Sequence, residues 1–194
     1  VCRYIMELAE ENTVPMKRID DAVRRILRLK FRLGLFDDPL SQKSGFGNFG
    51  SRQSAETAYR AALESEVLLK NEEGLLPLKK DSRILLVGPN AGSVRSLNGG
   101  WSYSWQGEQS DNEEFTAEYH SIREALSAKF SNMEYLPVLE YAPYGDFRKE
   151  IRGDYGDAVC AARKADVIIV AAGENSYCET KGNINELTIS PDQS

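Results

Sequence analysis

The sequence predicts an α/β protein with a mostly parallel sheet flanked by helices. Two apolar runs of strand type, 84–87 and 167–171, each lead into a glycine within two residues. Amphipathic helical patterns lie between these runs, and alternating strands and helices are typical of βαβ units. Hydrophobic residues make up 41% and charged residues 28% of the chain, which fits a globular domain with an ordinary core.

Several classes of protein are disfavoured by the composition. The net charge is −6, and basic residues cluster only over 18–32, so we do not expect nucleic-acid binding. Three widely spaced cysteines and a single histidine, His120, argue against a disulfide framework and against a zinc site. We expect no metal and no cofactor. Apolar runs stay far below the ~18 residues of a membrane span.

The first third of the chain reads as helices. The sequence opens in mid-helix over 2–11, so we expect it to be a piece of a longer protein. An amphipathic helix is predicted over 17–33, and Gly34 follows where a helix-ending glycine belongs. Two helices cannot bury their apolar faces alone, so this segment should dock on another part of the protein.

A linker candidate follows at 37–51, which is rich in glycine, serine and aspartate and contains a proline. Ser51 is a plausible N-cap for a helix over 52–70. Strand 84–87 then leads into a long loop, 91–116, which holds both tryptophans. Loops of this length are usually functional or disordered, and the tryptophans argue against disorder. The remaining predicted elements are a helix over 118–130, a strand over 135–141, a helix over 154–165 and the strand over 167–171.

The loop after the last strand is the first candidate for chemistry. In open α/β sheets ligands bind beyond the carboxyl ends of the strands, and right-handed crossovers place those ends on one edge. We therefore expect loop 173–182 and the loop with Trp101 and Trp105 to share one rim. Loop 173–182 contains two carboxylates, a tyrosine and a lysine, namely Glu174, Glu179, Tyr177 and Lys181.

These residue types suit sugar recognition, because indole packs against the apolar face of a pyranose while polar groups bind its hydroxyls. Packing of both tryptophans in the core or in a lid is the alternative. Glu179 would act as a general acid if burial raised its pKa more than Lys181 lowered it. The simpler alternative is a solvated loop glutamate. Glu174 lies closer to the strand and is placed to orient the loop.

A nucleotide-binding α/β domain is a further alternative, and it needs a backbone cradle for phosphate. The glycines over 88–93 match neither G-x-G-x-x-G nor G-x-x-x-x-G-K-[ST]. The glycines over 45–50 match only in part, and no strand precedes them. Phosphate binding is therefore not favoured.

Several segments together resemble glycoside hydrolase family 3. The resemblance lies, in the family's order, in 18–36, in 67–71 with 75–78, in 87–91 and in 99–101, and it runs from about residue 15 to the end. The family implies a (β/α)8 barrel carrying an aspartate nucleophile, followed by an α/β sandwich that supplies the acid/base.

On this resemblance the chain would divide into three parts. Residues 1–36 would be the C-terminal helices of a truncated barrel domain, 37–54 the interdomain linker, and 55–194 the N-terminal part of the sandwich. The partners implied are a β-glucoside or β-glucan oligosaccharide and the barrel domain of the same polypeptide. The family also suggests a secreted or periplasmic protein.

The chain is similar to the plant-type exo-β-glucanase subgroup and its bacterial relatives, whose acid/base glutamate lies in Gly-Glu-x-x-Tyr-x-Glu-Thr-Lys-Gly. That pattern covers 173–182 and implies Glu179 as the acid/base, supported by its loop neighbours. The second tryptophan of Gly-Gly-Trp-x-x-x-Trp, here Trp105, would stack on the aglycone sugar, and Trp101 is a weaker match. Asn183 stands where the plant-type pattern has aspartate, which leaves the role of that position open. The neighbours expected to support the loop are Glu174, Tyr177 and Lys181.

The resemblance thus implies part of a retaining, exo-acting β-glucosidase that releases terminal β-D-glucosyl residues. Since the nucleophile would lie outside these 194 residues, we expect the chain alone to be inactive. The alternatives are a related β-xylosidase and a non-catalytic carbohydrate-binding or scaffolding domain.

Overall fold

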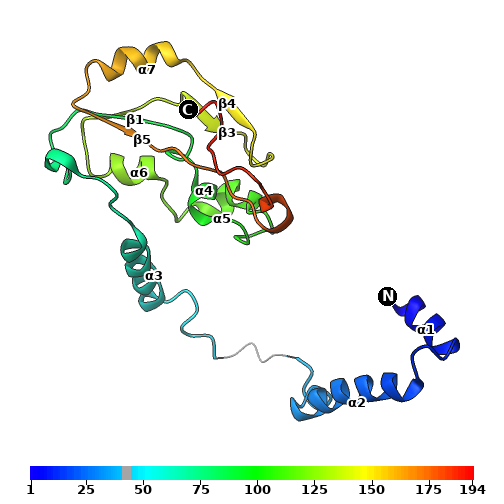
Figure 1. Ribbon diagram of the computed structural model, residues 1–194. Coiled ribbons are helices and arrows are strands. Elements are labelled where there is room, and N and C mark those ends of the chain that lie inside the picture. The colour runs from blue at the N-terminus through cyan, green and yellow to red at the C-terminus, as the bar shows by residue number, and fades with distance from the viewer. Residues whose placement is uncertain (41–44) are drawn as a thin grey trace. The chain divides into compact units, whose positions relative to one another are not determined.

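The computed structural model describes residues 1–40 and 45–194 (Figure 1). It contains two compact units, Val1–Leu69 and Lys70–Ser194. Part of the predicted linker, 41–44, lies outside the described residues, and the domain boundaries drawn from the resemblance remain predictions. Within the described ranges no helix is both long and apolar enough to cross a lipid bilayer.

The first unit consists of helices. Its elements are α1 (Cys2–Glu10), α2 (Met16–Arg32) and α3 (Arg52–Ser65). α2 ends as predicted, because Gly34 adopts a left-handed φ of +68° and Leu35 N–H donates to Lys30 O at 3.1 Å. The apolar stripe of α2 stays exposed, with Val23 at 49% and Ile26 at 58%. This unit does not cover that stripe by itself, as expected of so few helices.

α3 is shorter than predicted. Ser51 caps it, since Ser54 N–H donates to Ser51 Oγ at 3.2 Å, but the helix ends at Ser65 and not at residue 70. The Ser65 hydroxyl donates to Ala62 O at 2.7 Å, and such side-chain bonds compete with the helical ladder. Glu66 is then extended, with ψ at 131°.

The second unit is built on a three-stranded parallel sheet in the order β2-β1-β5, which confirms the predicted fold class. Ile84 lies opposite both Met133 and Val167, so β1 is the central strand. Its residues Ile84, Leu85 and Leu86 are at most 2% exposed and belong to the core. Helices α7 and α6 lie on opposite sides of the sheet (Figure 1). The bounds are β1 (Ile84–Val87), β2 (Met133–Tyr135), β5 (Val167–Val170), α6 (Ile122–Ser127) and α7 (Tyr155–Ala162).

The single strand predicted over 135–141 is wrong. β2 ends at Tyr135, and β3 (Leu139–Tyr141) instead pairs antiparallel with β4 (Glu150–Arg152). Pro137 explains the break, because proline has no N–H to continue a ladder. β4 was not predicted, since a strand of three residues gives no readable alternation.

The helix predicted over 118–130 is also too long. Ser121 and Glu124 form a capping box: Ser121 N–H donates to Glu124 Oε2 at 2.8 Å and Glu124 N–H donates to Ser121 Oγ at 3.4 Å. This reciprocal cap fixes the start of α6 at Ile122.

The region 91–116, predicted as a loop, contains short helical turns. They are α4 (Val94–Asn98), η2 (Glu108–Asp111) and α5 (Glu113–Thr116). The other short turns are η1 (Glu72–Gly74) and η3 (Glu179–Gly182). Ser93 caps α4 through its Oγ, which accepts from Ser96 N–H at 3.0 Å, so the tryptophans follow an ordered turn.

Candidate functional site

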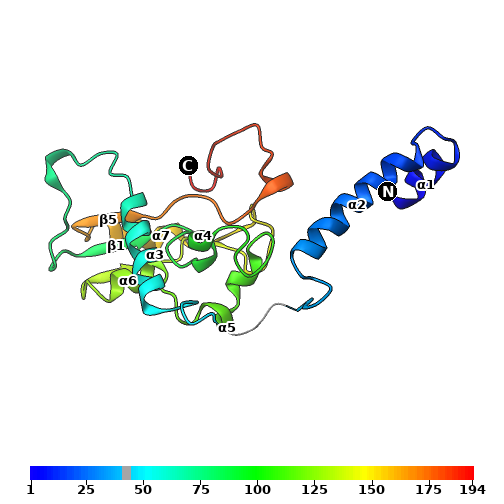
Figure 2. The same cartoon turned by 90° about the horizontal axis from the view of Figure 1, so that it is seen from below.

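The segment that leaves β5 runs beside α4 and brings the two candidate loops together (Figure 2). The Gln106 side chain bonds to both backbone groups of Cys178: Nε2 donates to Cys178 O at 3.2 Å, and Oε1 accepts from Cys178 N–H at 3.1 Å. The Cys178 thiol donates to Trp105 O at 3.0 Å. The prediction that the tryptophan loop and loop 173–182 share one rim is therefore confirmed.

Two glycines allow this close approach. A Cβ on Gly107 would lie 2.5 Å from Gly99 O and 2.6 Å from Ser176 Oγ, and its φ of +82° is itself unfavourable for other residues. A Cβ on Gly100 would lie 2.9 Å from Cys178 Cβ. A side chain at either position would push the two loops apart.

Glu179 opens η3 on the surface of this unit. Its φ is +54°, a left-handed conformation that costs a non-glycine residue about 1–3 kcal/mol and persists only where neighbouring contacts enforce it. In the described ranges no hydrogen bond or ion pair holds its carboxylate. Lys181 does not pair with Glu179. Its Nζ lies 3.9 Å from Asp146 Oδ2 instead.

Both tryptophans present their rings to solvent. Trp101 is 67% and Trp105 48% exposed, so neither is a core residue of this unit. Their ring centroids lie 6.5 Å apart at an interplanar angle of 46°, and Trp101 N–H donates to Trp105 O at 2.9 Å. The turn thus displays two tilted indole faces, which is the kind of surface on which a sugar ring packs.

Glu174 and Tyr177 brace the loop. Tyr177 OH donates to Glu174 Oε2 at 2.8 Å, and this bond raises the pKa of Tyr177. The Tyr177 ring packs against Phe147 with centroids 4.4 Å apart, and a Cβ on Gly182 would lie 3.2 Å from it. The aromatic ring therefore sits between the start and the end of the loop and limits its movement.

The base of the loop is held at Gly173. Gln193 accepts from Gly173 N–H at 2.9 Å and donates to Gly173 O at 2.8 Å. Tyr141 OH lies 3.0 Å from Gly173 O and 2.6 Å from Asn90 Oδ1. Burial raises the pKa of Tyr141, which keeps it a neutral donor.

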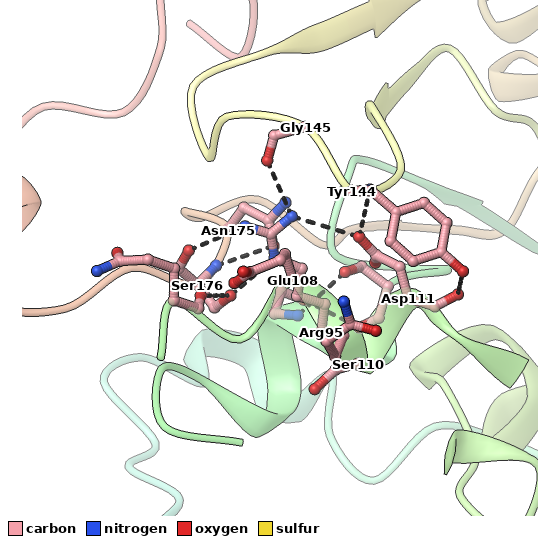
Figure 3. Close-up of polar contacts among 12 residues, drawn as sticks. Arg95, Glu108, Ser110, Asp111, Tyr144, Gly145, Asn175 and Ser176 are labelled. Carbon is pink, nitrogen blue, oxygen red and sulfur yellow. Dashed lines mark hydrogen bonds and ion pairs between the residues drawn. The ribbon is translucent and has the colours of Figure 1, made fainter. Parts of the chain in front are cut away.

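Arg95 is a residue that the sequence pattern did not single out (Figure 3). Its side chain is only 2% exposed. Nε donates to Ser176 Oγ at 2.8 Å and Nη2 to Ser176 O at 3.3 Å. Nη1 donates to Gly145 O at 3.1 Å and lies 3.3 Å from Asp111 Oδ2. One guanidinium thus joins α4 to the candidate loop, to the β3–β4 turn and to η2.

A signal for Arg95 did exist in the sequence. It is the only charged residue between Arg83 and Glu108, in a stretch otherwise made of apolar, small and amide side chains. A charge isolated in this way is often buried and paired.

The described residues contain no group of three or more His, Cys, Asp or Glu side chains placed to hold a metal ion.

The chain is similar in sequence to several glycosidases. The model of the glycosyl hydrolase family 3 C-terminal domain matches residues 66–194. The lysosomal beta glucosidase of Dictyostelium discoideum is 36% identical, over 97% of this chain and 23% of that protein. The periplasmic beta-glucosidase of Salmonella typhimurium is 34% identical, over 89% and 24%. A beta-xylosidase of Formosa agariphila is 30% identical, over 85% and 22%.

Solved structures agree with these relatives. A beta-glucosidase from Listeria innocua in complex with glucose has a TM-score of 0.69 at 29% identity, covering 97% of this chain and 24% of that one. A mutant of the same enzyme in complex with laminaribiose has a TM-score of 0.62 at 31% identity, covering 88% and 22%. The chain spans about a quarter of the length of the proteins it matches. It therefore belongs to glycosyl hydrolase family 3, with residues 66–194 in that family's C-terminal domain.

Proposed function

We propose that the chain is part of a retaining, exo-acting β-glucosidase in which Glu179 is the acid/base. The observation that supports this most is the joining of two loops: Glu179 follows Cys178, which is hydrogen-bonded to the loop that displays Trp105. A proton donor and a sugar-stacking face are thus held beside each other at the edge of the sheet where α/β proteins bind ligands.

In this mechanism Glu179 gives its proton to the leaving glycosidic oxygen and then takes one from the attacking water. A retaining enzyme also needs a nucleophilic carboxylate about 5–5.5 Å away. We place that nucleophile outside this chain. Glu179 is exposed in the isolated unit, so the proposed role requires that contact with the rest of the enzyme encloses it together with the substrate. The chain alone should therefore be inactive.

We also propose the domain assignment that the family resemblance implies. Residues 1–36 belong to a barrel domain, 37–54 form a linker and 55–194 belong to the sandwich. The substrate class proposed is a terminal β-D-glucosyl residue on a glucoside or glucan oligosaccharide. The glucose and laminaribiose complexes of the Listeria innocua enzyme support it. A periplasmic and a lysosomal relative support a compartment outside the cytosol.

The test uses the full-length polypeptide that carries this chain. Glu179→Ala should lower kcat/KM by about 10²–10⁴-fold for substrates with poor leaving groups, since such groups need protonation. It should change kcat/KM for 2,4-dinitrophenyl β-glucoside far less, while kcat for this substrate falls because the attacking water has lost its base, and azide should restore that turnover as a glucosyl azide. Equal losses on both substrates without azide rescue would refute the assignment. Glu186→Gln, at an exposed carboxylate that bonds only to Thr188 among the described residues, serves as the control.

The exposed tryptophans also favour a second candidate, a carbohydrate-binding domain without catalysis. In that case sugar affinity would follow the same pH titration in the parent protein and in Glu179→Gln. Hydrolysis of β-xylosides faster than β-glucosides would select the related xylosidase activity instead, which the Formosa agariphila relative represents.

A further inference from the structure

Gln106 is a buried amide between the two loops of the site. It is 8% exposed, and its side chain satisfies both backbone groups of Cys178, at 3.1 Å for Cys178 N–H and 3.2 Å for Cys178 O. A primary amide carries one acceptor oxygen and one donor nitrogen. It can therefore make the two hydrogen bonds that a neighbouring strand would make to the backbone of Cys178. Few other side chains can make both bonds at once.

Two further contacts fasten the same segments. Ser176 Oγ donates to Gln106 O at 2.7 Å, and the Cys178 thiol donates to Trp105 O at 3.0 Å. Ser176 is therefore hydrogen-bonded to Gln106, and Cys178 to both Trp105 and Gln106. The tryptophan that faces solvent and the amide that faces the other loop are consecutive in the sequence.

These contacts determine the position of Glu179. Its carboxylate is exposed and has no partner among the described residues, so its position depends on its backbone, which adopts the left-handed φ of +54°. Such a conformation is maintained only by contacts on the adjoining residues. The residue before it, Cys178, is fixed at its N–H, at its C=O and at its thiol.

We propose that Gln106 is a positioning residue that couples Trp105 to Glu179. It would fix the distance between a sugar stacked on the Trp105 indole and the proton on the Glu179 carboxyl. This rests on the function proposed above. Proton transfer requires heavy atoms within about 2.6–3.2 Å. A misplacement of about 1 Å costs on the order of 10²-fold in rate, so loss of the contacts that hold Cys178 should slow proton transfer from Glu179.

The test is made in the full-length enzyme with Gln106→Met, which keeps the side-chain length but loses both bonds. We expect kcat/KM for a cello-oligosaccharide to fall about tenfold or more, with less than a twofold change in kcat/KM for 2,4-dinitrophenyl β-glucoside. Gln109→Met, at an exposed glutamine on η2, should behave like the parent enzyme. Equal losses on both substrates, or no loss, would overturn the proposal.

A second variant covers the case in which Gln106→Met does not fold. Gln106→Glu still accepts from Cys178 N–H but cannot donate to Cys178 O when ionised, so it should show the same selective loss. Hydrogen exchange gives a readout independent of activity: the Cys178 amide should exchange faster in Gln106→Met, which loses its acceptor, and not in Gln109→Met. Unchanged Cys178 exchange in Gln106→Met would also overturn the coupling.

Combining substitutions separates this proposal from the one on which it rests. In a Glu179→Ala background, Gln106→Met should add no further loss on the cello-oligosaccharide, because the group it positions is gone. If Glu179→Ala itself shows no selective loss and no azide rescue, the proposed function fails. If Glu179→Ala behaves as an acid/base variant while Gln106→Met matches Gln109→Met, only the coupling fails.

Discussion

Arg95→Met should lower the free energy of unfolding of the second unit far more than a substitution at the surface does. The change keeps an unbranched side chain but removes a guanidinium that is 2% exposed and bonded to three segments. Removing one partner of a buried ion pair typically costs about 3–5 kcal/mol, because the other charge stays behind unpaired. Here Asp111 is 18% exposed and keeps Tyr144 N–H at 2.8 Å, so we expect the lower end, about 3 kcal/mol.

Tryptophan fluorescence during urea unfolding measures this effect, because both tryptophans of the sequence lie in the second unit. The midpoint should fall at an unchanged m-value. Arg83→Met is the matched control: its side chain is 63% exposed and paired with Asp166, so its loss should be a small fraction of that of Arg95→Met. Similar losses in the two variants would refute the argument from burial. Arg95→Lys should fall between, since lysine keeps the charge but not the planar fork.

Three other variants test the site and the sheet. Trp105→Ala should raise KM for oligosaccharides more than for short aryl glucosides, and equal increases would count against aglycone stacking. Glu179→Gly should be more stable than Glu179→Ala by about 1 kcal/mol in the same urea assay, because glycine adopts φ of +54° without strain; a more stable alanine variant would contradict this. The Arg83 side-chain hydrogen bond holds the pKa of Asp166 at about 2, below its ordinary 3.8. The stability advantage over Asp166→Asn should be complete above about pH 4 and lost as the pH falls to about 2; an advantage that grows on acidification would refute it.

Strands β1 and β5 were readable from the sequence because each is a continuous apolar run. The apolar runs 84–87 and 167–171, which contain these strands, are long enough to be recognised alone, and the rule for strand ends then placed the two loops together. Element boundaries were less accurate, although their causes are local. The Ser121–Glu124 capping box and Pro137 are both visible in the sequence and would have corrected the helix and the strand.

The network around Arg95 could not be predicted in the same way. Its acceptors on Asp111, Gly145 and Ser176 lie 16, 50 and 81 residues further along the chain. No local sequence pattern predicts these contacts, because they depend on how three separate turns pack over one helix. The isolated charge suggested burial, but only the fold identifies its partners.

The contact between the glycines and the facing loop has a consequence for engineering substrate range. Gly100 and Gly107 lie against Cys178 and Ser176 with no room for a Cβ, so a randomised library that includes them would consist largely of misfolded clones. Trp101, at the exposed tip, tolerates replacement sterically. Selection for new aglycones should therefore enrich changes at the crest of this turn and leave its glycine hinges untouched.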